Sequence, residues 1–562
     1  MRTYTFVYTA ISLLSITLCA QSRVTTTPAG CRKLKTDVDW PSHAQWEAAL
    51  PGVIATNGSD IHGPLPNYRL QAKSVEDVRK AVRFAKDHNI RLSVLTTGHD
   101  QMLRSDAGSG LLIDLSLFQG SRVMPAYTAT TEGLPFVGID AEAEPIKLVE
   151  GEQAAVSFGP ALAGLPLNYA VSKSGLFTVS GGAATVAVGG GWGQNGGYGP
   201  MTSQYGLGVD QWLEALIVTP DGELRVANSA INSDLFWAIR GGGGSTFGVV
   251  VQATWKAHVP VPMTGYNWYI NSTLEASELE PGTYATSEAL RYLLGSQSGI
   301  SNANKIWGPI LSNVSSLPGI TPFQTRAFEF SSYREFFEGT YGTLVPQPTT
   351  ADHRYDRGIV PYDSRLLSAE HLVSPNITQA LAETGGSLGV QIMSPGSRFG
   401  NGSSVSANPG WRKAAALIIA FKTNTTSADG LRRLAPDMGT YINEASVTEP
   451  NWSSSFWGSN YARLSELKRK YDPEMRFWVS PGINADYMQA KDGRACMVDP
   501  IPSTPSEYPP PTDRRFDANI TADAEFLFGH QELTGSTFPR SRDRAWPTSR
   551  TSILISHSII YL

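Results

Sequence analysis

The stretch that decides the fold reads Ser93-Val-Leu-Thr-Thr-Gly-His-Asp100. It closes a strand–helix–strand pattern that starts near Asn67. The middle element is expected to be a helix, because Ser74 and Asp77 form a capping-box pattern. Apolar residues then repeat at helical spacing, at Val78, Ala81, Val82 and Ala85. The β-rich run 91–97 ends in a turn at 98–100, and the apolar run 111–115 predicts the following strand. His99 is therefore expected on a turn directly after a strand.

Two blocks of glycine follow further along the chain. Nine of the nineteen residues from Gly181 to Gly199 are glycine, around a run, 185–188, that is typical of a strand. The second block, 241–244, precedes a strand-like run at 247–251. Backbone with so few side chains lets main-chain N–H groups approach a ligand closely, and a pyrophosphate is the usual one. Tight turns without a ligand are the alternative for either block alone.

One motif in the first block points to a different fold. Gly191-Trp-Gly-Gln-Asn-Gly196 matches the G-x-G-x-x-G pattern, and Asp210 stands near the place of a ribose-binding acid. In dinucleotide-binding folds this motif opens a helix whose N-terminus faces the pyrophosphate. Here Gly197, Gly199 and Pro200 occupy the positions where that helix would run. We therefore reject a Rossmann interpretation.

Length and composition set the broad class of protein. The 562 residues are too many for one compact core, which favours two domains, or one domain interrupted by another. Hydrophobic residues make up 41% and charged residues 17%, as in ordinary globular proteins. A formal net charge of −5, without a long basic run, argues against nucleic acid as a partner. After the N-terminus no segment approaches the roughly 20 apolar residues of a membrane span.

The first 20 residues predict a signal peptide and therefore secretion. Arg2 supplies the positive charge, 6–18 is a short apolar stretch, and small residues precede a cut at Gln21. A buried N-terminal helix is the alternative. The apolar tail 552–562 is either a lipid-anchor signal or a chance extension. Eight glycosylation sequons support the secretory route: Asn57, Asn271, Asn313, Asn376, Asn401, Asn424, Asn451 and Asn519.

Cysteine usage agrees with an oxidising compartment. Removal of the signal leaves Cys31 and Cys496, near opposite ends of the expected folded region. We predict one disulfide between them. Two cysteines are too few for a cysteine-rich zinc or iron–sulfur site, and no metal is expected.

Several segments, in this order, resemble one known family. They are 93–100 with 110–116, then 189–200, 205–214 and 232–250, and near the C-terminus 456–461, 471–473 and 477–484. Together they are similar to the vanillyl-alcohol-oxidase superfamily, in its fungal berberine-bridge-like branch, which includes proteins described as isoamyl alcohol oxidases. Each motif alone is weak, but all of them in the family's order, over about residues 31–496, are specific.

The resemblance implies an α+β fold with a PCMH-type FAD-binding domain that is split by an inserted domain. Its first part is expected at residues 31–260 and its last part at 441–496. A substrate domain with an antiparallel sheet, 261–440, would lie between them. Residues 1–20 would be the signal peptide, and Pro/Ser-rich chain from 497 to 562 would be an extension.

The resemblance also implies FAD, attached through its 8α-methyl group to His99. A structural turn histidine is the alternative for His99 taken by itself. Many relatives carry a second tether, a cysteine two residues before the threonine of the glycine-rich segment. This chain has Ala183 there, before Thr185, so a single tether is expected. The other cofactor-binding residues expected are Thr97, Gly98, Asp100, Gly182, Gly190, Asn195, Gly196, Tyr198, Val250 and Asn484.

The chemistry implied is hydride transfer from a small-molecule C–H to flavin N5, while a base takes an adjacent proton. Candidates for the base are Tyr266, Tyr269 and Glu444, although packing or surface roles are open for each. The substrate would be an alcohol, a sugar or a secondary metabolite, with O2 as the expected electron acceptor. A redox-neutral cyclisation or isomerisation, or a binding protein on a degenerate flavin fold, are the alternatives.

Overall fold

The structure, a computed structural model, describes residues 27–498 apart from 57–58, 61–62, 65, 103, 106–107, 273–285, 295–297, 319, 342–361, 386–387, 422–425 and 492. The expected signal peptide, the sequons at Asn57, Asn424 and Asn519, and the chain from residue 499 onward lie outside the described residues. Within the described part of the chain, no helix combines the length and the apolar character that crossing a membrane requires.

The N-terminal sheet forms around the motif that carries His99. Its strands are β1 (Ile54–Ala55), β4 (Tyr68–Gln71), β6 (Leu111–Asp114) and β5 (Leu92–Leu95), in that spatial order. β6 pairs in parallel with both β4 and β5. The predicted helix is α2 (Val75–Asp87), capped by Ser74, whose side chain accepts a hydrogen bond from the N–H of Asp77. The strand–helix–strand prediction is confirmed. Helix α1 (His43–Ala49) and the hairpin β2–β3 (Ser59–Asp60, Gly63–Pro64) precede it.

The helical spacing seen in the sequence is the packing face of α2. Val78, Ala81, Val82 and Ala85 are fully buried and belong to one core cluster with residues of β4, β5 and β6. Burial of such side chains stabilises the fold by about 1.5–3 kcal/mol each for the larger ones. The helix therefore fixes the sheet at whose edge the His99 turn emerges.

A second, antiparallel sheet has the order β10-β9-β11-β8-β7. The strands are β7 (Ser121–Met124), β8 (Ala155–Phe158), β9 (Trp212–Val218), β10 (Leu224–Asn228) and β11 (Val249–Lys256), with helices α3 (Gly164–Ser172), α4 (Thr202–Tyr205) and α5 (Ser233–Ile239). The predicted strand after the second glycine block is the start of β11. The predicted strand at 185–188 is wrong: Ala187 forms a single bridge to Ala163, and Val188–Trp192 form a helical turn of π type. Glycine-rich backbone is free to adopt such a turn.

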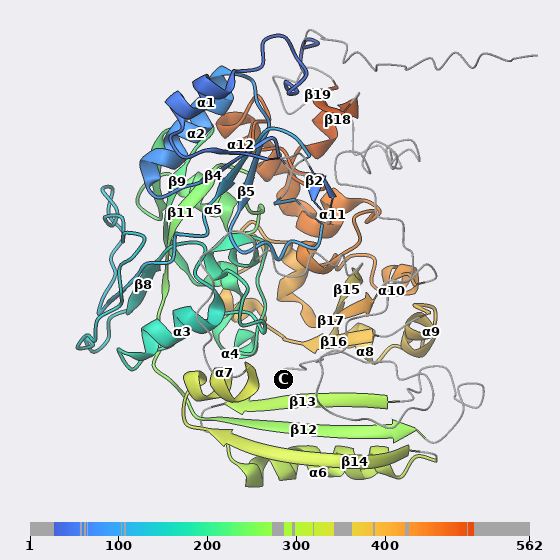
Figure 1. Ribbon diagram of the computed structural model, residues 1–562. Coiled ribbons are helices and arrows are strands. Elements are labelled where there is room, and N and C mark those ends of the chain that lie inside the picture. Colours follow the sequence, from blue (N-terminus) through green and yellow to red (C-terminus); the bar gives the residue numbers. More distant parts are fainter. Residues whose placement is uncertain are drawn as a thin grey trace, which may run out of the picture.

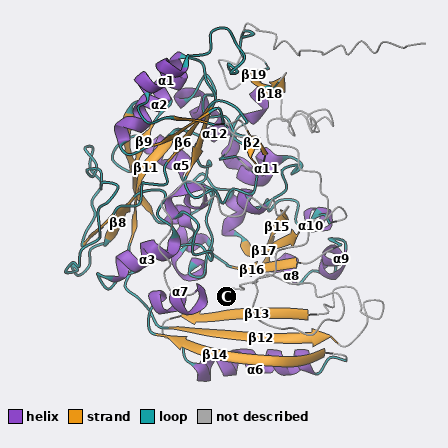
Figure 2. Cartoon of the chain, in the orientation of Figure 1, coloured by secondary structure: helices purple, strands orange, loops and turns teal. Residues whose placement is uncertain are grey.

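The middle of the chain forms two three-stranded antiparallel sheets (Figures 1 and 2). One has the order β13-β12-β14, with β12 (Met263–Ser272), β13 (Thr286–Leu294) and β14 (Ile320–Phe330), and helix α6 (Ile300–Ser315) contacts β14 and β12. The other is β15-β17-β16, with β15 (Tyr362–Ser368), β16 (Leu388–Ile392) and β17 (Ala414–Phe421). Helices α8 (Ala369–Leu372), α9 (Ile377–Ala382) and α10 (Asp429–Leu434) lie in the same segment.

Helix α7 (Tyr333–Tyr341) anchors this middle segment to the rest of the molecule. It contacts α3, and its residues Tyr333, Phe336 and Phe337 are buried in the largest core cluster. The guanidinium of Arg334 lies 4.6 Å from the ring centre of Tyr169 on α3. The sheet β13-β12-β14 thus contacts α7 through β14, and α7 contacts α3. The α+β fold class with antiparallel sheets in the middle of the chain agrees with the prediction.

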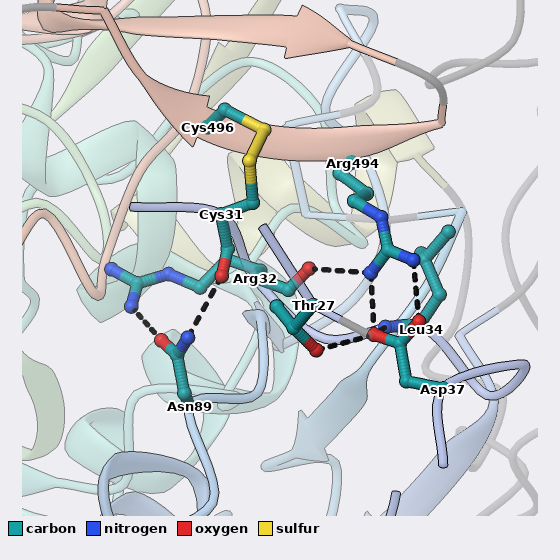
Figure 3. Close-up of a disulfide and its surroundings, with 8 residues drawn as sticks. All are labelled: Thr27, Cys31, Arg32, Leu34, Asp37, Asn89, Arg494 and Cys496. Atoms are coloured by element: carbon teal, nitrogen blue, oxygen red, sulfur yellow. Dashed lines mark hydrogen bonds and ion pairs between the residues drawn. A yellow bond between two sulfur atoms is a disulfide. The ribbon is translucent and has the colours of Figure 1, made fainter. Parts of the chain in front are cut away.

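The C-terminal segment returns to the N-terminal region. It contains α11 (Trp452–Trp457), α12 (Tyr461–Tyr471), β18 (Met488–Lys491) and β19 (Arg494–Met497), and single 3-10 turns include Ile442–Glu444 and Ala485–Tyr487. The structure joins Cys31 and Cys496, the pair that the sequence predicts, by a disulfide across 465 residues. Figure 3 shows Arg494, next to this disulfide, paired with the buried carboxylate of Asp37. The first and last parts of the described chain therefore form one body.

Four of the eight sequons have described side chains, and all four are exposed: Asn313, Asn376, Asn401 and Asn451. The side chain of Asn271, on β12, lies outside the described residues.

Candidate active site

A cavity of about 460 Å³ lies where four parts of the chain meet. The turn after β5 forms the first part of the wall, and the two glycine blocks together form the second. The segment 441–444 and the sheet β15-β17-β16 complete it, through Tyr441, Glu444, Tyr362, Gln391 and Phe421 among others. The His99 turn is thus brought together with segments that lie hundreds of residues away in the sequence.

The turn presents His99 to this cavity. Gly98 has a φ of 79°, a left-handed conformation that glycine adopts without steric cost. Nε2 of His99 lies 3.0 Å from Oγ1 of Thr185, so the imidazole is oriented by the first glycine block. Burial lowers the pKa of His99 to about 4, and the contact with Thr185 opposes this only in part. The ring is therefore neutral at physiological pH.

The two glycine blocks lie side by side in the wall of the cavity. A Cβ added to Gly244 would lie 3.4 Å from the Cα of Gly191, and Gly243 has a φ of +102°. Gly191 has no heavy atom within 3.4 Å of the position of an added Cβ, and it is exposed to the cavity. The absence of side chains here leaves main-chain N–H groups accessible to a ligand.

Asn195 provides a polar atom that lacks a protein partner. Its Nδ2 donates to the carbonyl of Gly191 at 2.8 Å and to Oδ1 of Asn443 at 2.9 Å. Its Oδ1 is buried and has no hydrogen-bond partner in the described structure, although the residue lines the cavity. A buried acceptor without a protein partner is available to a donor from a ligand or a water. The facing glycines, the neutral His99 and this acceptor fit a flavin nucleotide.

Glu444 lies among three tyrosines at the other side of the cavity. The hydroxyl of Tyr198 donates to Oε2 of Glu444 at 2.7 Å. Burial raises the pKa of Glu444 to about 7, against the opposing effect of the Tyr198 hydrogen bond. Burial, and then the charge of Glu444, raises the pKa of Tyr362 to about 12 and that of Tyr441 further. Glu444 can therefore exchange a proton near neutral pH, whereas the tyrosines stay protonated.

Asn443, the neighbour of Glu444, links this wall to the other two. Its Oδ1 accepts from Nη2 of Arg104 at 2.8 Å, in addition to the bond from Asn195. Its Nδ2 donates to the hydroxyl of Tyr441 at 2.7 Å. Arg104 in turn pairs with Asp100, at 2.5 Å between Nη2 and Oδ1. The turn, the glycine block and the segment 441–444 thus form one hydrogen-bonded network.

Most of the residues that the sequence singled out line this cavity: Thr97, Gly98, His99, Asp100, Gly182, Gly190, Asn195, Tyr198, Val250 and Glu444. Gly196 and Asn484 lie outside the lining. Gly196 accepts from the N–H of Val209 and faces the ring of Trp411. Asn484 is fully buried, and its Nδ2 donates to the carbonyl of Ser465 at 3.3 Å. Tyr266 and Tyr269 lie on β12, and their side chains are outside the described residues.

Sequence reasoning missed Arg104, Asn443, Tyr441 and Tyr362. Arg104 stands four residues after Asp100, the spacing of a local ion pair, so its pairing had a sequence signal. Asn443 and Tyr441 stand beside Glu444, which was a candidate, but their contacts reach Arg104 and Asn195 over more than 200 residues. No local pattern encodes such contacts.

The model of the FAD binding domain family matches residues 66–228, and the model of the berberine and berberine-like family matches 440–484. The first match covers the His99 turn and the first glycine block, and the second covers Asn443 and Glu444. The two matches therefore include the His99 turn, the first glycine block and the segment 441–444, whereas the second glycine block and the sheet β15-β17-β16 lie outside them.

One related sequence and two solved structures are also flavin-linked proteins. An uncharacterized FAD-linked oxidoreductase from Arthroderma benhamiae is 30% identical over 79% of this chain and 84% of its own length. The VAO-type flavoprotein MtVAO713 from Myceliophthora thermophila C1 has a TM-score of 0.70 at 23% identity, over 83% of this chain and all of the other. Glucooligosaccharide oxidase from Acremonium strictum, whose flavin is described as 6-S-cysteinyl, 8α-N1-histidyl FAD, has a TM-score of 0.56 at 17% identity, over 78% of this chain and 99% of the other. The chain belongs to the FAD-linked oxidoreductases, has the fold of the VAO-type flavoprotein structures, and matches the berberine and berberine-like family at residues 440–484.

Proposed function

We propose that this enzyme is a secreted oxidase that removes a hydride and a proton from an alcohol, a sugar or a hydroxylated secondary metabolite, with Glu444 as the base. The observation that carries the proposal is the position of Glu444, which lines the same cavity as His99 and both glycine blocks. FAD held by His99 and the glycine blocks would supply the hydride acceptor, and O2 would then take both electrons with two protons, which gives hydrogen peroxide.

Glu444 is suited to accept the hydroxyl proton of the substrate. A general base works best when its pKa lies near the working pH, and burial raises the pKa of Glu444 to about 7. Oε2 is occupied by the hydroxyl of Tyr198, and no hydrogen bond to Oε1 is found among the described residues. Tyr198 therefore fixes one oxygen and leaves the other for the substrate.

The described part of the cavity next to Glu444 is formed by the sheet β15-β17-β16. Tyr362, Ile419 and Phe421 supply apolar and aromatic surface there, and Gln391 supplies an amide. Aromatic faces and one amide accept a neutral hydroxylated molecule, either a sugar ring or an aromatic metabolite. The substrate would lie between this sheet and the glycine blocks.

We also propose that His99 holds the flavin through a single covalent bond. The ring is neutral at physiological pH, because burial lowers its pKa to about 4, and a neutral imidazole keeps a lone pair for bond formation. Thr185 orients the ring at 3.0 Å. Ala183, which lines the cavity, has no nucleophile for a second bond.

Secretion is supported by the N-terminal pattern, by the Cys31–Cys496 disulfide and by the exposure of the four described sequons. N-terminal sequencing of protein from the medium of a fungal host should start at Gln21, and glycosidase treatment should lower its apparent mass. An unprocessed N-terminus at Met1 would contradict this part of the proposal.

Oxygen uptake tests the proposed reaction. The secreted protein is incubated with small alcohols, oligosaccharides and aromatic hydroxy compounds, and O2 consumption and peroxide are measured together. We expect at least one class to give peroxide in equal amount to the O2 consumed, and Glu444→Gln to abolish most of it. Product formation without O2 consumption would instead favour a redox-neutral cyclisation or isomerisation.

A further inference from the structure

Arg104 lines the cavity but has no part in the chemistry proposed above. Its Nε lies 3.0 Å from Oδ1 of Asp100, and its Nη2 lies 2.5 Å from the same oxygen. Its side chain is only 10% exposed and that of Asp100 15%, so this pair is largely shielded from solvent. An arginine that faces a cavity often binds a substrate carboxylate. Here the guanidinium is instead neutralised by Asp100.

The second contact of Arg104 reaches across the chain. Its Nη2 donates to Oδ1 of Asn443 at 2.8 Å, over 339 residues of sequence. Asp100 thus fixes the guanidinium, and the guanidinium fixes an amide that stands next to Glu444. Contacts with both Asp100 and Asn443 leave the planar guanidinium of Arg104 little rotational freedom.

The amide of Asn443 can take only one orientation in this network. Its Oδ1 faces two donors, Arg104 and Asn195, whereas its Nδ2 faces two acceptors, the hydroxyl of Tyr441 and the carbonyl of Gly191. Rotation of the amide by half a turn would oppose its N–H groups to the donors of Arg104 and Asn195, and its oxygen to the carbonyl of Gly191. The backbone at 443 is therefore held by its own side chain.

Glu444 follows directly in the same 3-10 turn, Ile442–Glu444. Its N–H donates to the carbonyl of Tyr441, and its carbonyl accepts from the hydroxyl of Ser364 on β15 at 2.5 Å. The turn is thus fixed on one side by β15 and on the other by Asn443. Removal of the Asn443 restraint would leave the carboxylate free to move away from Tyr198.

We infer that Arg104 is a positioning residue for Glu444, which acts through Asn443 to keep the carboxylate against Tyr198 inside the cavity. The inference rests on the proposed role of Glu444. Among the described residues, the titratable groups that interact with that carboxylate are Tyr198 from the glycine block, Tyr441 from the preceding turn and Tyr362 from β15, and the charge of Arg104 acts on Tyr441.

The decisive variant is Arg104→Lys, because it keeps the positive charge and loses the planar fork that contacts Asp100 and Asn443 together. Infrared difference spectra of the full-length flavoprotein are recorded as a function of pH, and the carboxyl band that Glu444→Gln removes is followed. The wild-type band should titrate with a midpoint near pH 7, the pKa that burial gives Glu444. In Arg104→Lys the carboxylate gains access to water. Relief of burial, the larger effect on its pKa, outweighs the loss of the Tyr198 hydrogen bond, so the midpoint should fall by about one pH unit.

A matched control lies on the surface. Arg225 pairs with Asp221 at the same four-residue spacing, with side chains 36% and 42% exposed. Arg225→Lys should leave the midpoint unchanged. If Arg104→Lys fails to fold, Asn443→Ser tests the same step, because it removes the link and leaves the Asp100–Arg104 pair; it should lower the midpoint likewise.

A midpoint in Arg104→Lys or Asn443→Ser equal to that of the wild type overturns the inference. The failure of the proposed function has a different signature. Full oxidase activity in Glu444→Gln would remove Glu444 as the base, whatever the midpoints of the other variants.

Discussion

The hydroxyl of Tyr198 donates a 2.7 Å hydrogen bond to Oε2 of Glu444, which lies 246 residues later in the chain. The tyrosine lies in the first glycine block, and the glutamate lies in the segment that matches the berberine-like family. The contact therefore joins the cofactor side of the cavity to the C-terminal segment. It also leaves the carboxylate within a buried environment, where its pKa is raised to about 7.

Replacement of Glu444 should affect turnover far more than folding. Glu444→Gln keeps the shape of the side chain and removes the base, so kcat should fall by about 10²–10⁴-fold. Tyr198→Phe removes only the fixing hydrogen bond and should have a smaller effect. Steady-state oxygen consumption measures both, and Glu466→Gln, at an exposed position on α12, is the control. Unchanged turnover in Glu444→Gln would exclude this residue as the base.

The pH dependence of turnover should follow the ionisation of Glu444. Only the carboxylate can accept a proton, so kcat should rise as the pH increases through about 7, the raised pKa of this group. This rise of kcat with pH should be absent from the residual activity of Glu444→Gln. If kcat of that variant still rises at the same pH, the ionising group is a residue other than Glu444.

The raised pKa of Glu444 also makes the stability of the fold depend on pH. The pKa of Glu444 is about 7 in the folded protein and 4.5 in its ordinary state. The unfolded chain therefore releases this proton at lower pH than the folded protein, and folding becomes less favourable between these values as the pH rises. The Tm of Glu444→Gln relative to wild type should increase from pH 4.5 to pH 7, measured by scanning calorimetry. A constant difference would contradict the burial of this carboxyl.

The absence of a side chain at Gly191 should matter for cofactor binding and not for folding. An added Cβ there meets no heavy atom closer than 3.8 Å, so Gly191→Val should fold, but its side chain would enter the cavity. We expect secretion of the variant with little bound flavin, measured as the ratio of flavin to protein absorbance. Gly308→Val is the control, because Gly308 has nothing within 4 Å and lies on α6. Full flavin content in Gly191→Val would mean that the cofactor lies elsewhere.

The disulfide should stabilise the body that carries the site. Cys31 and Cys496 close a loop of 465 residues, and loss of such a bond costs about 2–5 kcal/mol of unfolding free energy. The double variant Cys31→Ser/Cys496→Ser should therefore unfold at lower denaturant concentration. Alkylation of the denatured, unreduced wild type should detect no free thiol at either position, and two labelled cysteines would contradict the bond.

The sequence predicts the local parts of this site well. β4, α2 and β5 are encoded by a capping residue, helical spacing and a β-rich run, so the position of His99 on a turn after a strand could be predicted. Glycine density marked both blocks, which lie side by side at Gly191 and Gly244. These features depend on neighbours in the chain, which short patterns record.

The parts that the sequence did not predict depend on long-range contacts or on freedom of the backbone. The run 185–188 has strand composition, yet the glycines around it allow a helical turn of π type at Val188–Trp192. Gly196 stands in the glycine block but faces Trp411, because the block turns away from the cavity there. Asn443 had no local signal, since its partners Arg104 and Asn195 come from distant segments.

The attachment of the flavin to His99 is the central claim, and acid precipitation of the secreted protein tests it most directly. The account predicts a yellow pellet with flavin absorbance, and peptide mapping that places the flavin on the peptide containing His99. His99→Ala should release its flavin into the supernatant, whereas Ala183→Ser should not. A white wild-type pellet with flavin in the supernatant would contradict the covalent bond, and wild-type protein without any flavin would contradict the proposed function itself.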